Sequence, residues 1–155
     1  MKPPKQPFWL TFWKVAVVSY ILAGLLNSIP AKADWILIPG LSKHVHTETK
    51  HNQQNYGIGY EWEAADGRNW AIGTYRNSYW RQSSFVLTEL TSYKFSDTIR
   101  IRLDAGAVTG YKWTVMPIAL PVWTYENKRW GFDAITIPPV GGRMGVFAVQ
   151  FKVKF

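Results

Sequence analysis

The stretch that decides the fold is the last one, GGRMGVFAVQFKVKF, residues 141–155. From Phe147 to Phe155 every odd position is apolar, while the even positions between them are small, polar or charged. Alternation with a period of two is typical of a β-strand with one apolar and one polar face. In a soluble sheet the apolar face packs on a core, whereas in a transmembrane β-barrel it faces lipid and the polar face lines the lumen. The aromatic end favours a barrel strand that closes against the first strand; the alternative is a C-terminal strand of a soluble sandwich.

The N-terminal segment favours an exported protein. Lys2 and Lys5 precede an apolar run over 8–26, which is followed by Pro30 and the small-residue pattern at 31–33. This order is typical of a bacterial secretory signal, and it predicts cleavage after Ala33. An uncleaved anchor helix is the alternative, because 8–26 nearly reaches the length that spans a bilayer. We therefore expect a signal peptide over 1–33 and one barrel domain over 34–155.

Charge and cysteine content narrow the function classes. Four of the 18 basic residues lie within 1–33, so the mature chain carries 14 basic and 10 acidic residues. Such a modest positive excess suits a surface rich in anionic lipopolysaccharide and does not indicate a nucleic-acid partner. With no cysteine, the domain must be held by a core, a partner or a membrane. The nine Trp, eight Tyr and eight Phe would supply aromatic girdles at two membrane interfaces.

The mature chain divides into eight segments with strand character and no helical period between them. We expect strands near 35–47, 56–63, 69–79, 85–95, 99–106, 113–125, 130–137 and 147–155. Asp66-Gly67 is a strong hairpin signal between the second and third segments. Short, evenly spaced strands predict an all-β, eight-stranded antiparallel up-and-down transmembrane β-barrel.

Charged residues on the inner face of a narrow barrel must pair with one another. Arg100, Arg102 and Asp104 alternate with apolar residues in the fifth segment. We expect them to form networks in the lumen with the other charges at inward positions, which are Glu61, Glu63, Lys152 and Lys154.

Two stretches could carry chemistry at one rim. Residues 42–46 (SKHVH) lie near the end of the first strand, and 76–79 (RNSY) near the end of the third. In an up-and-down barrel the ends of odd-numbered strands share a rim, which is extracellular if the N-terminus is periplasmic. His44 and Ser78 could serve there as a general base and an activated hydroxyl for acyl transfer; the alternative is that they are polar loop residues. His44 and His46 share a strand face and His51 follows, but without a further carboxylate or cysteine ligand we expect no metal.

A resemblance adds to this interpretation. Over 36–155 the chain resembles the PagP family of outer-membrane lipid A palmitoyltransferases. The landmarks that carry the resemblance come in the family's order: Leu37-Ile38-Pro39 followed by His44, Gly57-Ile58-Gly59, Asp66-Gly67, Asn69-Trp70, Asn77-Ser78, Ala105-Gly106, Trp113, the stretch 117–121, Ile137-Pro138 and the final Phe-x-x-x-Phe.

The resemblance implies a barrel whose lumen takes the acyl chain of a phospholipid and transfers it to lipid A at the outer rim. It implies His44, Ser78 and Asn77 as the catalytic candidates. It also implies Pro39, Pro121 and Pro138 as sites of lateral lipid access, because a proline cannot donate to the strand ladder. No cofactor is implied, and we expect a monomer in the bacterial outer membrane.

The chain departs from the family at three points. Asn77 stands where the family has an aspartate; an amide can orient a partner but cannot stabilise an imidazolium by charge, and restoring the aspartate would be expected to keep or raise activity. The family's amphipathic N-terminal helix is missing. Glu89 falls where the family sets the acyl-chain length with a small residue, so a glutamate that points inward would shorten or polarise the pocket floor.

Two further hypotheses stay open from the sequence. One is a non-catalytic outer-membrane barrel of the same fold that binds lipopolysaccharide or only occupies the surface. The other is a soluble periplasmic β-barrel that binds a lipid.

Overall fold

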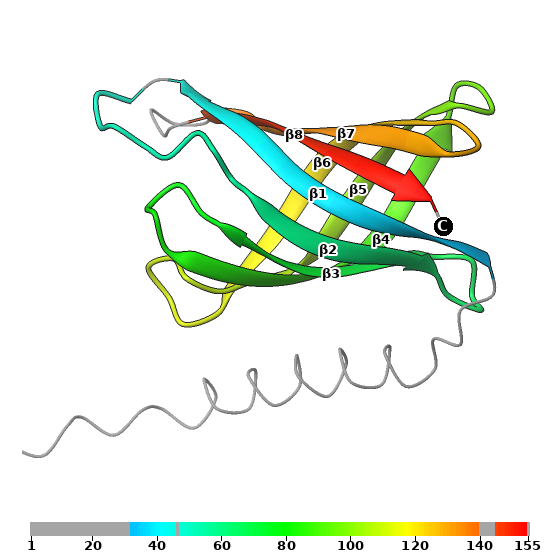
Figure 1. Ribbon diagram of the computed structural model, residues 1–155, viewed down its shortest axis with the longest axis horizontal. Coiled ribbons are helices and arrows are strands. Elements are labelled where there is room, and N and C mark those ends of the chain that lie inside the picture. The colour runs from blue at the N-terminus through cyan, green and yellow to red at the C-terminus, as the bar shows by residue number, and fades with distance from the viewer. Residues whose placement is uncertain (1–31, 46, 140–144, 155) are drawn as a thin grey trace, which may run out of the picture.

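The chain forms a closed antiparallel barrel in which each strand pairs with its neighbours in sequence and β1 pairs with β8 (Figure 1). The computed structural model describes residues 32–45, 47–139 and 145–154. Its strands are β1 Lys32–Val45, β2 Gly57–Glu63, β3 Asn69–Arg76, β4 Gln82–Lys94, β5 Ile99–Val108, β6 Met116–Glu126, β7 Trp130–Ile137 and β8 Gly145–Lys154. The predicted eight-stranded up-and-down barrel is therefore confirmed. Among the described residues no helix is long and apolar enough to cross a bilayer.

Four strand boundaries differ by three residues from those expected, and one of them is the end of β3, which lies at Arg76 rather than Tyr79 because residues 77–80 form a turn. β1 begins at Lys32, just before the expected cleavage point, while residues 1–31 lie outside the described part of the chain. β4 begins three residues early because Gln82 pairs with Arg76 across a tight connection. β6 begins at Met116 rather than near residue 113, because its pairing with β5 ends at Met116.

The closing strand β8 has the orientation that its alternation predicts. Phe147, Phe151 and the two valines between and beyond them are exposed on the outer face. Lys152 on the inner face is fully buried, and the Gln150 amide donates to the Asp133 carboxylate at 3.0 Å. Apolar residues outside and polar residues inside are the pattern of a transmembrane barrel.

Aromatic side chains on the outer surface gather towards the two ends of the barrel. At the end that holds the C-terminus, Phe95 stacks on Trp123 and Trp130 stacks on Phe151, with ring centroids 5.9 and 6.1 Å apart. At the opposite end Tyr56, Trp80 and Trp113 are exposed, and exposed aliphatic residues lie between the two groups. Two aromatic bands separated by an apolar belt match the girdles of barrels that span a bilayer.

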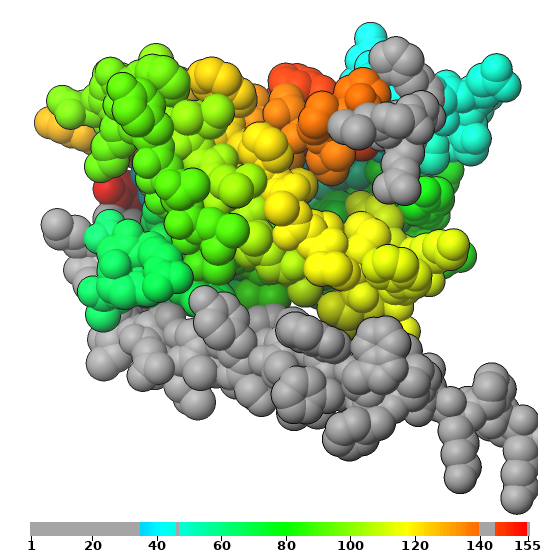
Figure 2. Space-filling view, turned by 180° about the vertical axis from the view of Figure 1, so that it is seen from behind, coloured from blue at the N-terminus to red at the C-terminus, as the bar shows by residue number. Residues whose placement is uncertain are grey.

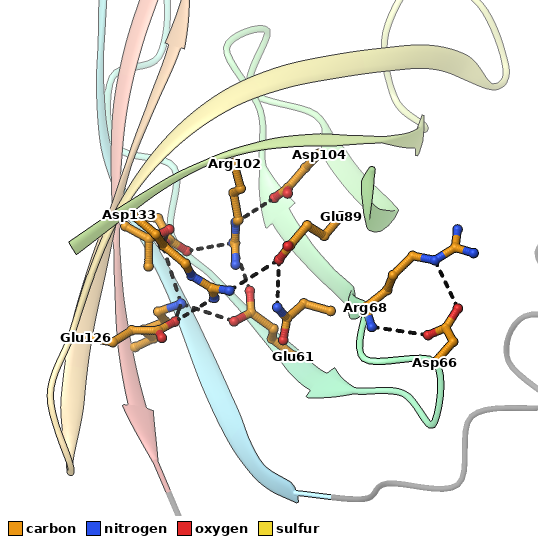
Figure 3. Close-up of polar contacts among 12 residues, drawn as sticks. Glu61, Asp66, Arg68, Glu89, Arg102, Asp104, Glu126 and Asp133 are labelled. Atoms are coloured by element: carbon orange, nitrogen blue, oxygen red, sulfur yellow. Dashed lines mark hydrogen bonds and ion pairs between the residues drawn. The ribbon is translucent and has the colours of Figure 1, made fainter. Parts of the chain in front are cut away.

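The lumen at the C-terminal end is filled by ion pairs (Figure 3). Arg102 lies 2.8 Å from Glu61, 3.0 Å from Asp104 and 3.2 Å from Asp133. Lys152 contacts Glu61 at 3.0 Å, Asp133 at 3.4 Å and also Glu126. Arg100 joins Glu126 to Glu89. The expectation of a paired network is confirmed for Arg100, Arg102, Asp104, Glu61 and Lys152. Glu89, Glu126 and Asp133 were not expected in it, and within the described part of the chain the network reaches neither Glu63 nor Lys154, whose amine lies over the Trp35 ring.

The other half of the lumen is apolar. The Phe85 ring lies there over Gly73 and Gly59 and packs, with Leu87, on the cluster that contains Leu37. A Cβ atom at Gly73 would lie 2.6 Å from this ring, so the glycine is what leaves room for it. Leu120 and Val122 are buried beside the network, where they pair with Asp104 and Arg102. The barrel thus has a charged half near the chain ends and an apolar half near the opposite rim.

The network makes Lys152 indispensable to the barrel. Lys152→Met would leave the buried carboxylates of Glu61 and Asp133 and the half-buried one of Glu126 without one of their cations, and we expect it to lower the free energy of unfolding by about 3 kcal/mol or more. Lys94→Met, on an exposed lysine, is the control and should change it by less than about 0.5 kcal/mol. Urea titration of the refolded protein in detergent micelles measures both. Equal midpoints for the two variants would contradict the assigned role of the network.

Candidate functional site

His44 and Ser78 meet at the rim opposite the C-terminus. His44 lies one residue before the end of β1, and Ser78 lies in the turn between β3 and β4. The His44 Nε2 atom is 2.8 Å from the Ser78 hydroxyl oxygen, which is hydrogen-bond distance. The structure therefore brings together, on one rim, the two residues that the sequence singled out as base and hydroxyl.

The connection between β1 and β2 holds this pair in place. The Asn52 backbone N–H donates to the Ser78 carbonyl at 2.9 Å, and its side-chain amide donates to the Asn77 carbonyl at 3.1 Å. Asn55 donates to the Arg76 carbonyl at 2.9 Å. Sequence reasoning missed both buried asparagines, because they lie in a polar stretch that shows only a loop and no motif.

Asn77 has a different role from the one expected of it. Its side chain is fully buried, and its oxygen accepts hydrogen bonds from the backbone N–H groups of Tyr79 and Arg81 at 2.8 and 3.1 Å. Its NH₂ group donates to the Ser83 hydroxyl and to the Gly110 carbonyl at 2.9 and 2.8 Å. These four bonds use the whole capacity of the amide, so Asn77 positions Ser78 through the backbone and does not orient His44 or the Ser78 hydroxyl directly.

The turn around Asn77 is under local strain. The Trp80 N–H donates to the Asn77 carbonyl at 3.0 Å, and Trp80 has a φ of 59°. The left-handed region is unfavourable for a bulky residue and persists only where surrounding contacts determine it. Here the bonds of Asn77 to both sides of Trp80 supply those contacts.

A row of rings lies beside the His44–Ser78 pair. The His51 ring stacks on His44 with centroids 4.6 Å apart and an interplanar angle of 24°. Tyr79 meets His51 edge-on at 5.5 Å and Tyr111 edge-on at 5.9 Å. The Tyr111 hydroxyl lies 2.9 Å from that of Tyr75 on β3. The sequence showed His51 only as a conceivable metal ligand, since a ring stack between residues seven apart in a loop has no sequence signature.

No group of three His, Cys, Asp or Glu residues within the described part of the chain could hold a metal ion. His46, the remaining histidine of the conceivable set, lies outside the described residues.

The three prolines lie where strand pairing stops or shifts. Pairing between β6 and β7 begins only at Val122–Ile135, so β6 from Met116 to Pro121 pairs with β5 alone. Pro138 follows the last residue of β7. At Pro39 the β1–β8 register shifts, and the β1–β2 ladder ends two residues earlier at Leu37. The longest interruption of the barrel wall therefore lies between β6 and β7, near the rim that carries His44.

Glu89 points into the lumen and is nearly buried. Its carboxylate accepts a hydrogen bond from the Asn69 amide at 2.7 Å and pairs with Arg100 at 3.2 Å. The crevice bounded by Glu61, Glu89 and Arg102 leaves no room for a water molecule. Glu89 is thus part of the charged half of the lumen and marks where the apolar half ends.

Comparison with known proteins identifies the fold and no family. No protein-family model matches the chain, and no curated protein matches it. A solved structure from the de novo design of transmembrane β-barrels is similar over 82% of this chain and 100% of its own, with a TM-score of 0.60 and 13% sequence identity.

The hydrogen bonds of Asn77 lead to a prediction about stability, beside the one about activity drawn from the resemblance. In Asn77→Asp a carboxylate oxygen would face the Gly110 carbonyl and the donation to it would be lost, so we expect a loss of about 1–3 kcal/mol in the free energy of unfolding. Asn127→Asp is the matched control, because the Asn127 oxygen accepts from Arg129 and Trp130 just as an aspartate would. Urea titration in micelles compares the unfolding midpoints of the two variants. An unchanged midpoint for Asn77→Asp would contradict the stabilising role assigned to the hydrogen bonds of Asn77.

Proposed function

We propose that this protein is an outer-membrane acyltransferase that moves an acyl chain from a phospholipid to lipid A. The observation that carries the proposal is the His44–Ser78 contact at 2.8 Å, at the rim of a closed barrel with an apolar outer surface. A histidine within hydrogen-bond reach of a hydroxyl is the minimal arrangement for general-base chemistry on an ester. The collinear resemblance to the PagP family supports the same reaction.

In the proposed reaction His44 acts as the general base. Its Nε2 atom takes the proton of a lipid A hydroxyl as that oxygen attacks the phospholipid ester carbonyl, while the Ser78 hydroxyl donates a hydrogen bond to the ester. Collapse of the tetrahedral intermediate breaks the bond to the glycerol oxygen, which takes the proton back from His44. The products are acylated lipid A and a lysophospholipid, and the step needs no cofactor.

The division of the lumen sets where the acyl chain would lie. Its apolar half adjoins the rim with His44, and the ion pairs around Glu89 and Arg100 form a charged floor. A methylene chain is excluded from such a floor, because burying it there would strip polar partners from the charges. We therefore expect an acyl group limited in length by Glu89 and its partners, and movement of Phe85 when the chain enters.

Lateral access follows from the interruptions in strand pairing. Unpaired backbone between β6 and β7, beside Pro121 and Pro138, offers less resistance to a lipid tail than a continuous ladder. Pro39 marks a second, shorter interruption. On this proposal the partners are a phospholipid donor, lipid A as acceptor and the membrane itself; the protein acts as a monomer, reaches the outer membrane by the signal peptide over 1–33, and binds no nucleic acid.

A second candidate is a non-catalytic barrel that binds lipopolysaccharide. The close filling of the lumen by Phe85 and by the charged residues favours it, since an acyl chain must displace a ring to enter.

Mass spectrometry of lipid A from cells that express the protein tests the proposal. We expect lipid A to gain one acyl group with the wild type. His44→Ala and Ser78→Ala should each reduce that gain by about a hundredfold or more, because each removes a group that acts on the reacting atoms. Ser84→Ala, on an exposed serine of the neighbouring strand, is the matched control and should leave the gain unchanged.

The outcomes separate the two candidates. Full acylation by both alanine variants would show that the site is placed wrongly. No acylation by the wild type, with the protein folded in the outer membrane, would favour the non-catalytic barrel.

A further inference from the structure

A hollow of about 340 Å³ lies next to the His44–Ser78 pair, and neither His44 nor Ser78 lines it. It is lined by Tyr79 and Arg81 of the β3–β4 turn, Tyr111 and Lys112 of the β5–β6 loop, and Met116 at the start of β6. Figure 2 shows the surface over β4, β5 and β6, in green to yellow, with the β5–β6 loop at its edge. The hollow thus joins two loops at the rim opposite the C-terminus (Figure 1).

The hollow carries positive charge that its neighbours do not compensate. Arg81 and Lys112 are exposed, and neither forms an ion pair with any residue that the structure describes. Burial raises the pKa of Tyr111, although hydrogen bonds with Tyr75 and Ser78 act against this, so the phenol stays neutral. Two basic side chains and the tyrosine hydroxyls are donors suited to an oxyanion.

The loops that carry these donors are fixed relative to each other. The Asn77 side chain accepts from the Arg81 N–H and donates to the Gly110 carbonyl, so one amide ties the two loops together. Gly110 has a φ of +82°, and a Cβ atom there would lie 2.6 Å from the Ser83 hydroxyl, so only glycine allows this approach. The Tyr75–Tyr111 contact holds the second loop to β3. Because the loop backbones are fixed before binding, ordering on binding is confined to the exposed side chains of the site, which limits the entropy lost.

The surroundings of the hollow select a lipid rather than a free anion. Met116 gives it an apolar wall and begins the part of β6 that does not pair with β7. Trp80 and Trp113, exposed in the same two loops, are the residue type that marks the headgroup level of a bilayer.

We infer that this hollow binds the phosphate group of an anionic lipid, with Arg81 and Lys112 as its charged contacts and Met116 beside the first carbons of the lipid. The inference rests on the membrane placement proposed above but not on acyl transfer. It assigns the β3–β4 turn and the β5–β6 loop a headgroup-binding role next to the reacting pair.

Calorimetric titration of the folded protein in non-ionic detergent micelles tests it with three probes: dihexanoylphosphatidic acid, dihexanoylphosphatidylcholine and inorganic phosphate. We expect phosphatidic acid to bind about tenfold more tightly than either of the others. Arg81→Gln combined with Lys112→Gln should weaken phosphatidic acid binding by about tenfold or more. Lys43→Gln, an exposed lysine near the same rim but outside the hollow, is the matched control and should leave it unchanged.

Three results would overturn the inference: equal affinity for phosphatidic acid and phosphatidylcholine, unchanged binding in the double variant, or an equal loss in Lys43→Gln. Inorganic phosphate that binds as tightly as phosphatidic acid would show an anion site without lipid specificity and would also overturn it. The shift in electrophoretic mobility on heating shows whether each variant is folded. If the double variant is not, the two single variants take its place, and each should weaken binding. Because no acyl transfer is measured, an inactive wild type leaves this test intact.

Discussion

The barrel depends on the pairing of the charges that it buries. Arg102 and Lys152 lie inside a narrow lumen, where an isolated charge would cost several kcal/mol. Glu61, Asp133 and Glu126 come from three other strands and surround them, so the network joins β2 to β5, β6, β7 and β8. Because these contacts need the strands that carry them in one register, the network favours the closed barrel as well as filling half of its lumen. The acyl chain of the proposed reaction would therefore have to lie in the other half.

That other half has the opposite character, and the difference places the site. Its lumen is apolar, the β6–β7 ladder stops at Val122, and the loops rather than the strands satisfy the polar groups at the rim. His44 and Ser78 meet there because Asn52 fastens the β1–β2 loop onto the turn after β3. A rigid charged end and a more open apolar end suit a protein that must hold its shape in a bilayer while a lipid reaches its rim.

The sequence predicts the parts of this structure that repeat with a period of two. Strand-like segments along the whole chain predicted the strand count, and alternation in β5 and β8 predicted the inward position of Lys152 and its contact, like that of Arg102, with Glu61. The acidic partners Glu89, Glu126 and Asp133 were not predicted. Residue chemistry and the position of two strand ends at one rim led to His44 and Ser78 as candidates, and the resemblance to a known family supported the same pair. The stack of His51 on His44 could not be foreseen, because the path of a loop is set by backbone hydrogen bonds that leave no pattern in side-chain type. For the same reason the start of β6 was expected three residues too early.

Asn77 shows why a departure from a family pattern has to be judged by what surrounds the side chain. At this position two backbone N–H groups need an acceptor, while the Gly110 carbonyl needs a donor. An amide offers both at once, whereas a carboxylate has no hydrogen to donate. Beside His44 lies the His51 ring of the β1–β2 loop, so the imidazole has an aromatic neighbour where a carboxylate could have been expected. The asparagine is then a consistent part of a rearranged rim, since its amide fixes the turn that carries Ser78 and the backbone of Arg81, which lines the charged hollow, and ties that turn to Gly110 in the second loop.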